Sequence, residues 1–174
     1  MKLKKFKFKN VKSTNDTAIR IIKNKNITSG MVIADAQLKG KGQYGRKWAS
    51  LKGNLFVSFF NELKKTNLSI KVITKSNCLL VKNLLSKFTN KRITVKKPND
   101  LLIDKKKISG ILQEIILKKG KKFLITGIGI NITKHPNIKN YPATNLQDVA
   151  KKSISKLKVE NKLKHIFEKN LLKL

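Results

Sequence analysis

Short apolar segments of strand length recur along most of this chain and leave room for only two or three helices. Residues 3–9 alternate apolar and basic side chains, a pattern typical of a half-buried strand. Further strands are expected at residues 31–36, 54–60, 93–95, 101–103, 108–117 and 123–132. A short polar connection at residues 104–106 indicates a hairpin. The pattern predicts an α+β domain built on a single mixed β-sheet with flanking helices.

Helical spacing of apolar residues is confined to three places. Ser13 or Thr14 can cap a helix that has Asp16 in its first turn. A longer helix is expected at about residues 70–88, and a third at residues 155–172. The apolar side chains of that third helix are Leu157, Leu163, Ile166, Phe167 and Leu171. Because no long linker interrupts the 174 residues, the chain is predicted to be one domain, 1–174.

The formal charge of +32 is extreme and has two interpretations. One is binding to nucleic acid or to a membrane surface. The other is a compositional bias toward lysine, asparagine and isoleucine, such as an AT-rich genome would produce. The lysines are spread over nearly every segment and do not gather in one tail. That spread favours compositional bias, so specific DNA binding is not expected.

Cysteine and histidine content restricts the chemistry. Cys78 is the single cysteine and lies among apolar residues, so a buried, unreactive thiol is expected. His135 and His165 are far apart and have no second ligand at metal-site spacing. The basic N-terminus has no apolar signal-peptide core, and no apolar run approaches the length of a membrane span. We therefore predict a cytoplasmic protein without membrane association.

A glycine-rich stretch at residues 37–48 combines backbone freedom with positive charge. Gly40, Gly42 and Gly45 allow the backbone to approach a ligand closely. Arg46, one of only three arginines, offers the planar fork that grips phosphate or carboxylate. The stretch suits an anion. Taken alone, a surface hairpin in a lysine-rich chain is an equally good interpretation.

Three further stretches point to anionic substrates. Residues 96–100 end a strand at a proline and bring an amide beside Asp100, which is a candidate Mg²⁺ ligand or part of a plain turn. Lys107 begins a strand, and Gly127 and Gly129 interrupt an apolar one. With nine acidic residues and no serine in a nucleophile elbow, the chain favours positioning and charge neutralisation, as in phosphoryl or nucleotidyl transfer.

Together these stretches resemble the biotin–protein ligases. Residues 40–48 are similar to the family's Gly-Arg-Gly-Arg-x-Gly-Arg-x-Trp loop, and residues 96–100 to Lys-Trp-Pro-Asn-Asp. Residues 107–114 match Lys-[Leu/Ile]-x-Gly-Ile-Leu-x-Glu, and residues 127–131 match Gly-x-Gly-Ile-Asn. The resemblance runs in order over roughly residues 11–150. It implies the biotin/lipoate protein ligase catalytic-domain fold.

The resemblance also implies an activity and a set of site residues. Biotin and ATP would form biotinyl-5′-AMP, which then biotinylates a lysine of a biotin carboxyl carrier protein. By family position, Lys107 and Arg46 would be catalytic. Biotin would be bound by Ser13, Thr14, Asn15, Gln37, Gly40, Lys41, Gly42, Gln43, Lys107 and Gly110. ATP or the adenylate would be bound by Arg46, Trp48, Lys96, Asn99 and Asn131, with Asp100 near Mg²⁺.

The chain departs from the family pattern at three positions. Lys41 and Gln43 stand where the family has arginines, and Lys97 stands where it has tryptophan. Glutamine provides neither the charge nor the bidentate fork, so we predict that the adenylate is retained less tightly. Neither the DNA-binding domain nor the small C-terminal β-barrel domain of other members is expected in residues 1–174.

Two other functions remain open at this point. A lipoate or octanoate attachment enzyme would share the fold and the transfer of an acyl group to lysine. A basic nucleic-acid-binding protein would account for the charge, although aromatic content of 6% offers little surface for base stacking. The predicted partners are a carrier protein and, as an open alternative, a second copy in a homodimer.

Overall fold

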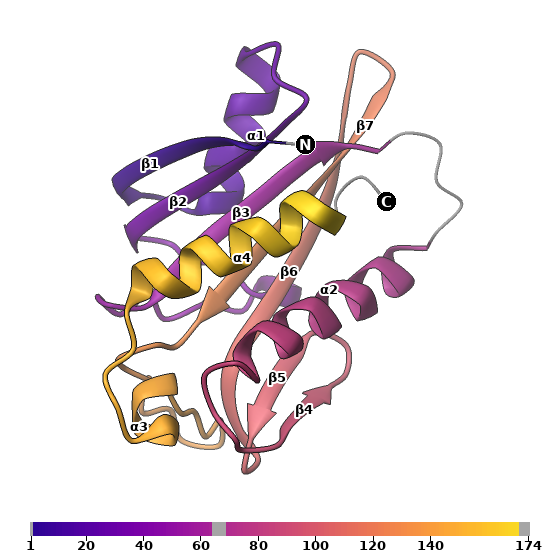
Figure 1. The fold of residues 1–174 in the computed structure, drawn as a ribbon. Helices are drawn as coiled ribbons and strands as arrows, with labels where there is room; N and C mark the ends of the chain where they lie inside the picture. Colours follow the sequence, from indigo (N-terminus) through magenta and orange to yellow (C-terminus); the bar gives the residue numbers. More distant parts are fainter. Residues whose placement is uncertain (1, 64–68, 171–174) are drawn as a thin grey trace.

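One seven-stranded sheet forms the centre of the molecule. The computed structural model describes residues 2–63 and 69–170, and the strand order is β1-β2-β3-β7-β6-β5-β4 (Figure 1). The strands are β1 (Lys4–Val11), β2 (Ser29–Gln37), β3 (Leu55–Glu62), β4 (Ile93–Lys96), β5 (Asp100–Ile103), β6 (Lys106–Lys118) and β7 (Lys121–Ile130). β1 and β2 are parallel and every other neighbouring pair is antiparallel. The predicted single mixed sheet is confirmed.

Tight turns set the register of the two hairpins on the β6 side of the sheet. Asp104 and Lys105, with φ of 47° and 63°, connect β5 to β6, and Lys119 and Gly120, at 49° and 74°, connect β6 to β7. Two consecutive residues of positive φ give the turn whose twist matches that of the flanking strands. Lys106 was predicted to lie in the turn between β5 and β6. It instead pairs with Ile103 as the first residue of β6.

Four α-helices accompany the sheet in the described residues. They are α1 (Thr14–Asn24), α2 (Ile70–Leu85), α3 (Leu146–Ala150) and α4 (Lys156–Asn170). Ser13 caps α1 by accepting a bond from the Asp16 backbone N–H, as predicted. α2 ends three residues earlier than expected because the N–H groups of Lys87 and Phe88 bond three residues back, tightening the last turn. α3 was not predicted, since five residues are too few to show a helical period.

The helices lie on both faces of the sheet, with α2 and α4 on one face and α1 on the other (Figure 1). The larger hydrophobic cluster lies under α2 and α4, where Phe59 and Phe167 stack with ring centroids 4.1 Å apart. A smaller cluster lies under α1. Leu157 was predicted on the apolar face of α4, but it is 58% exposed; residues 171–172 of that predicted helix, including Leu171, lie outside the described residues.

Ionic contacts join α4 to the β1–β2 edge of the sheet. The Lys156 ammonium lies 3.0 Å from the Asp35 carboxylate, and the Leu3 N–H donates to Glu168 at 2.8 Å. The hydrogen bond from Lys156 outweighs burial and lowers the pKa of Asp35. Charged contacts therefore supplement the apolar packing of this helix.

Two smaller predictions can also be compared with the fold. Cys78 is fully buried, and burial raises the pKa of its thiol to about 11, as expected for an unreactive side chain. In the described part of the chain, every helix is too short or too polar to cross a bilayer.

Candidate active site

The glycine-rich loop between β2 and β3 forms a small hairpin of its own. The Gly42 N–H donates to the Arg46 carbonyl at 2.7 Å, and the Trp48 N–H donates to the Gly40 carbonyl at 2.9 Å. Tyr44 and Gly45 form the tip, with φ of 55° and 73°. Backbone bonds therefore hold the loop in a defined shape and determine the direction of its side chains.

Trp48 anchors the base of this loop on the sheet. Its indole lies over Gly110 of β6 and Gly129 of β7, which are direct partners in the register. A Cβ at Gly129 would lie 2.4 Å from the ring, and one at Gly110 would lie 2.9 Å away. These two glycines are needed because the ring occupies the space of their side chains. The buried Trp48 Nε1 has no hydrogen-bond partner within residues 2–63 and 69–170.

Lys107 lies beside this indole at the start of β6. Its ammonium is 5.3 Å from the Trp48 ring centroid and 2.7 Å from the Asp100 carboxylate. The Lys107 backbone is fixed by bonds from its N–H to the Pro142 carbonyl and from the Thr144 N–H to its carbonyl. The cation is thus held on a rigid strand, and 35% of the Lys107 side chain is exposed.

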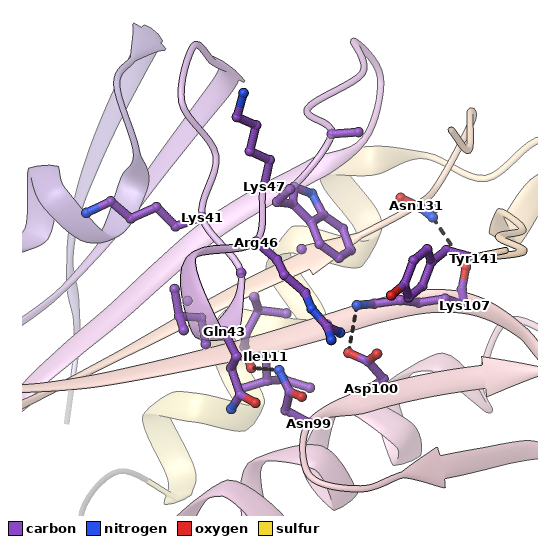
Figure 2. Close-up of a pocket in the computed structure, with 18 of the residues that line it drawn as sticks. Lys41, Gln43, Arg46, Lys47, Asn99, Asp100, Lys107, Ile111, Asn131 and Tyr141 are labelled. Carbon is purple, nitrogen blue, oxygen red and sulfur yellow. Dashed lines mark hydrogen bonds and ion pairs between the residues drawn. The ribbon is translucent and has the colours of Figure 1, made fainter. Parts of the chain in front are cut away.

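Two asparagines that were predicted to contact the nucleotide also bond the backbone of the site. The Asn99 amide donates to the Ile111 carbonyl at 2.7 Å (Figure 2). The buried Asn131 amide donates to the Thr144 carbonyl at 3.0 Å and to the Lys107 carbonyl at 3.4 Å. Asn131 thereby fixes the segment that holds Lys107.

The opposite end of the site is a buried network of hydroxyl and amide groups that is bonded to one carboxylate, Glu114. The Thr14 N–H and hydroxyl both contact the Gln37 amide oxygen, at 2.8 and 3.1 Å. Ser58 of β3 contacts Thr14 at 2.8 Å and Asn15 at 2.5 Å. The Asn15 amide donates to Glu114 at 2.7 Å. Each group has a fixed orientation, as a site that recognises donors and acceptors requires.

Lys41 has a contact that the sequence did not predict. Its ammonium lies 2.5 Å from the Asp16 carboxylate in the first turn of α1, and Figure 2 shows it directed away from Arg46 and Lys107. The hydrogen bond to Asp16 raises the pKa of Lys41, with a further contribution from the Glu114 charge. Lys41 was predicted to bind biotin, and in this arrangement its charge is directed toward α1.

Arg46 extends from the loop into the same space as Lys107 (Figure 2). The Arg46 guanidinium lies 5.7 Å from the centroid of the Tyr141 ring. Tyr141 belongs to the segment that precedes α3. Arg46 is therefore the loop cation directed into the mouth of the site, with Tyr141 on the opposite wall.

A single cavity of about 650 Å³ collects nearly all the predicted site residues. This volume lies within the range of small-molecule sites. Every predicted site residue except Gly40 lines the cavity. Gly40 instead packs against the Trp48 carbonyl, and a Cβ at this position would lie 2.5 Å from that oxygen. Lys107 and the 37–48 loop therefore share one cavity. Among the lining residues, Ile138 and Tyr141 were missed by sequence reasoning, as was Ser58, which bonds the lining residues Thr14 and Asn15 from β3. A serine within an apolar strand and the scarcity of tyrosine, with two in the chain, were the available signals.

Comparison with known proteins gives concordant matches. A profile described as the biotin/lipoate A/B protein ligase family matches residues 7–131. The bifunctional ligase/repressor BirA of Bacillus subtilis is 31% identical over 169 residues, covering 90% of this chain and 50% of that protein. This chain thus spans about half the length of that relative.

Solved structures agree with this match. Biotin protein ligase from Aquifex aeolicus in complex with biotin and ATP aligns with a TM-score of 0.81 and 33% identity, covering 98% of this chain and 71% of that one. Biotin protein ligase from Leishmania major in complex with biotinyl-5-AMP aligns with a TM-score of 0.79 and 25% identity, covering 95% and 74%.

Proposed function

This chain belongs to the biotin/lipoate A/B protein ligase family, and from that premise we propose that it is an ATP-dependent biotin–protein ligase. In the first step, a carboxylate oxygen of biotin attacks the α-phosphorus of ATP. The bond between the α-phosphorus and the β-phosphate oxygen breaks. Pyrophosphate departs, and biotinyl-5′-AMP is the product. In the second step, the amine of an acceptor lysine attacks the activated carbonyl, an amide forms and AMP leaves.

The observation that carries this proposal is the division of one cavity into an uncharged end and a cationic end. Thr14, Asn15 and Gln37 line the first, and Arg46 and Lys107 line the second. A ligand with a neutral hydrogen-bonding head and a carboxylate tail, such as biotin, matches this division. The carboxylate would then lie where cations offset its repulsion from a triphosphate.

Lys107 and Arg46 have separate roles in the first step. Lys107 is fixed on β6 and would stay beside the carboxylate and the phosphorus as negative charge develops there. Arg46 is on the loop and would grip phosphate oxygens with its two-pronged guanidinium. Trp48 would cover the reacting atoms and exclude water from the mixed anhydride.

The polar end of the cavity favours biotin over lipoate. Ser58, Thr14 and Asn15 are almost completely buried and bonded to one another. The ureido ring of biotin can exchange hydrogen bonds with such groups, whereas the dithiolane ring of lipoate has no N–H or carbonyl group to offer them. The lipoate alternative therefore becomes an outcome of the test below.

Magnesium would enter with ATP, and Asp100 is the residue of the cavity suited to it. The described ranges contain no cluster of three metal-binding side chains, and Asp100 is the one carboxylate among the residues that line the cavity. One carboxylate combined with substrate phosphates is a usual way to hold Mg²⁺. Asp100 is paired with Lys107, and an anionic ligand at Lys107 would leave the carboxylate free to face a cation.

The proposed acceptor is a biotin carboxyl carrier protein, and the proposed compartment is the cytoplasm, where ATP and such carriers occur together. A homodimer is retained as a further prediction, which sedimentation of the whole chain would test. The Bacillus subtilis relative is about twice as long as this chain. The proposed binding of the carrier protein and the proposed homodimer therefore refer to this chain and not to the longer relative.

The decisive experiment separates the two steps. Pyrophosphate release with ATP and biotin reports the first, and labelling of a biotin carboxyl carrier domain reports the second. Lys107→Ala should reduce the first step by about 10²–10³-fold, the usual effect of removing one group that stabilises developing charge. Lys106→Ala removes an exposed lysine from the adjacent position and should leave the rate unchanged.

Three results would contradict the proposal. Equal rates in the two lysine variants would remove Lys107 from the reaction. If the protein attaches lipoate to a lipoyl domain and does not transfer biotin, it is a lipoate attachment enzyme. Absence of ATP-dependent labelling, together with DNA affinity that falls steeply with salt, would favour the nucleic-acid alternative.

A further inference from the structure

Two very different contacts attach the glycine-rich loop to the rest of the molecule. At its base, the Trp48 ring is packed onto the sheet over Gly110 and Gly129. At its side, Lys41 pairs with Asp16, and both side chains are partly exposed, at 45% and 30%. The first contact is buried and fixed, whereas the second depends on an ion pair accessible to solvent and salt.

We propose that Asp16 is a positioning residue that holds Lys41, and through it the glycine-rich loop, against α1. By this contact Asp16 sets how long the activated intermediate remains in the cavity. The inference rests on the proposed function, since it concerns retention of the adenylate by the same site.

The backbone of the loop transmits this contact to the cation in the cavity. Lys41 pairs with Lys47 across the small hairpin, and the adjacent Gly42 N–H donates to the Arg46 carbonyl. A displacement of Lys41 from α1 therefore carries Arg46 with it. Arg46 is the group on this loop that we expect to grip phosphate, so the loop position fixes that contact.

Asp16 is well suited to a fixed anchor. It lies in the first turn of α1, where the helix dipole favours a carboxylate, and its N–H is bonded to the Ser13 cap. The Glu114 charge also acts on Lys41. Glu114 accepts a hydrogen bond from the Asn15 amide, so each carboxylate near Lys41 contacts a residue that lines the cavity.

This arrangement gives Lys41 a role other than contact with substrate. Its ammonium points toward α1 and away from Arg46 and Lys107 (Figure 2). A lysine in place of the family's arginine can still form a single ion pair of this kind. Gln43 contributes no charge to the loop, so the contact to Asp16 is the charged restraint on this side.

The expected effect is modest because exposed ion pairs contribute little. Loss of the pair should speed release of the adenylate by about two- to fivefold. The same argument predicts that rising salt weakens the restraint in the wild type and has less effect once either partner is removed.

The chain provides its own probe of loop position. Trp48 is the single tryptophan, so tryptophan emission reports the base of this loop alone. We would compare wild type with Asp16→Asn, Lys41→Met, the double variant and Asp16→Glu. Asp16→Asn preserves the size of the side chain, and Asp16→Glu preserves its charge. Asp104→Asn removes an exposed partner of Lys91 in a distant turn and serves as the matched control.

Two measurements test the inference. Release of the adenylate into excess unlabelled biotin should be two- to fivefold faster in each single variant than in the wild type. The double variant should release it no faster than either single variant, and Asp16→Glu should restore part of the wild-type retention. In the ligand-free protein, the salt dependence of Trp48 emission should be greater in the wild type and in Asp104→Asn than in Asp16→Asn.

An Asp16→Asn variant that matches the wild type in release and emission would overturn the inference. Additive effects in the double variant would do so too, because they would show that the two residues act independently. If the wild type forms no adenylate, the proposed function fails; an unchanged Asp16→Asn emission profile in the ligand-free protein would then overturn the restraint separately.

Discussion

The two faces of β7 show how one strand serves two purposes. Ile128 and Ile130 point to the face covered by α2 and α4 and belong to the larger hydrophobic cluster. Gly127 and Gly129 alternate with them and point to the cavity, where a Cβ would meet Asn15 and Trp48. Because successive side chains point to opposite faces, four consecutive residues supply both a core and a binding surface.

The comparison extends to the charged residues. On the packed face, the contacts of Asp35 and Glu168 hold α4 against the sheet edge. On the cavity face, Asp16, Asp100 and Glu114 each contact a cation or an amide that lines the cavity. In a chain with nine acidic residues, three are therefore used to orient the site.

The largest expected effect tests the packed face. Ile130 is fully buried, and Ile130→Ala should cost about 2–5 kcal/mol of unfolding free energy through lost burial and a residual cavity. Chemical denaturation measures this loss. The fraction that remains folded should bind biotin with unchanged affinity; a parallel loss of affinity would show that the two faces are coupled.

The adjacent residue should give the opposite pattern. Gly129→Ala places a methyl group where the Trp48 indole lies, at a cost of about 1–3 kcal/mol for overpacking. Since φ at Gly129 is outside the left-handed region, the effect is steric and not conformational. Trp48 emission should shift and biotin affinity should fall. A variant with unshifted emission and full affinity would contradict the contact.

This alternation explains how much of the molecule was predictable. Local patterns were sufficient for the strands, for the Ser13 cap and for the tight turn at Asp104, because each depends on neighbouring residues. The glycines at 127 and 129 stood out because they interrupt an otherwise apolar strand. The candidate site followed from motif spacing, and the cavity gathers those residues.

The parts that were missed depend on contacts between distant residues. Asp16 and Lys41 are 25 positions apart, and nothing in either local pattern indicates that they meet. Ser58 was read as part of an apolar strand, and its bonds to α1 became evident only from the fold. Gly40 was predicted to touch ligand, yet it accommodates the Trp48 carbonyl.

A smaller effect is expected from restoring charge on the cavity face. Gln43 lines the cavity, and Gln43→Arg should slow release of the adenylate by about three- to tenfold, as expected for one added hydrogen bond worth roughly 0.5–1.5 kcal/mol. Lys47→Arg is the matched control, because it adds a guanidinium to the same loop on a side chain that points away from Arg46 (Figure 2). Release that is no slower in Gln43→Arg refutes the prediction.

The smallest effect concerns acid sensitivity on the packed face. The hydrogen bond from Lys156 lowers the pKa of Asp35 in the folded protein. The stabilisation it provides is fully present above the unfolded value of about 4 and is lost as pH falls through the folded pKa. For an exposed pair this amounts to at most about 1 kcal/mol.

Unfolding free energies of wild type and Asp35→Asn should therefore differ near pH 6 and converge in acid. Asp104→Asn, which removes the partner of Lys91 in the β5–β6 turn, should show a smaller change. A wild-type advantage that persists at pH 2 would mean that Asp35 contributes through packing and not through its charge. In that case the ion pair would not be the contact that holds α4 to the sheet edge, and apolar packing alone would distinguish the two faces.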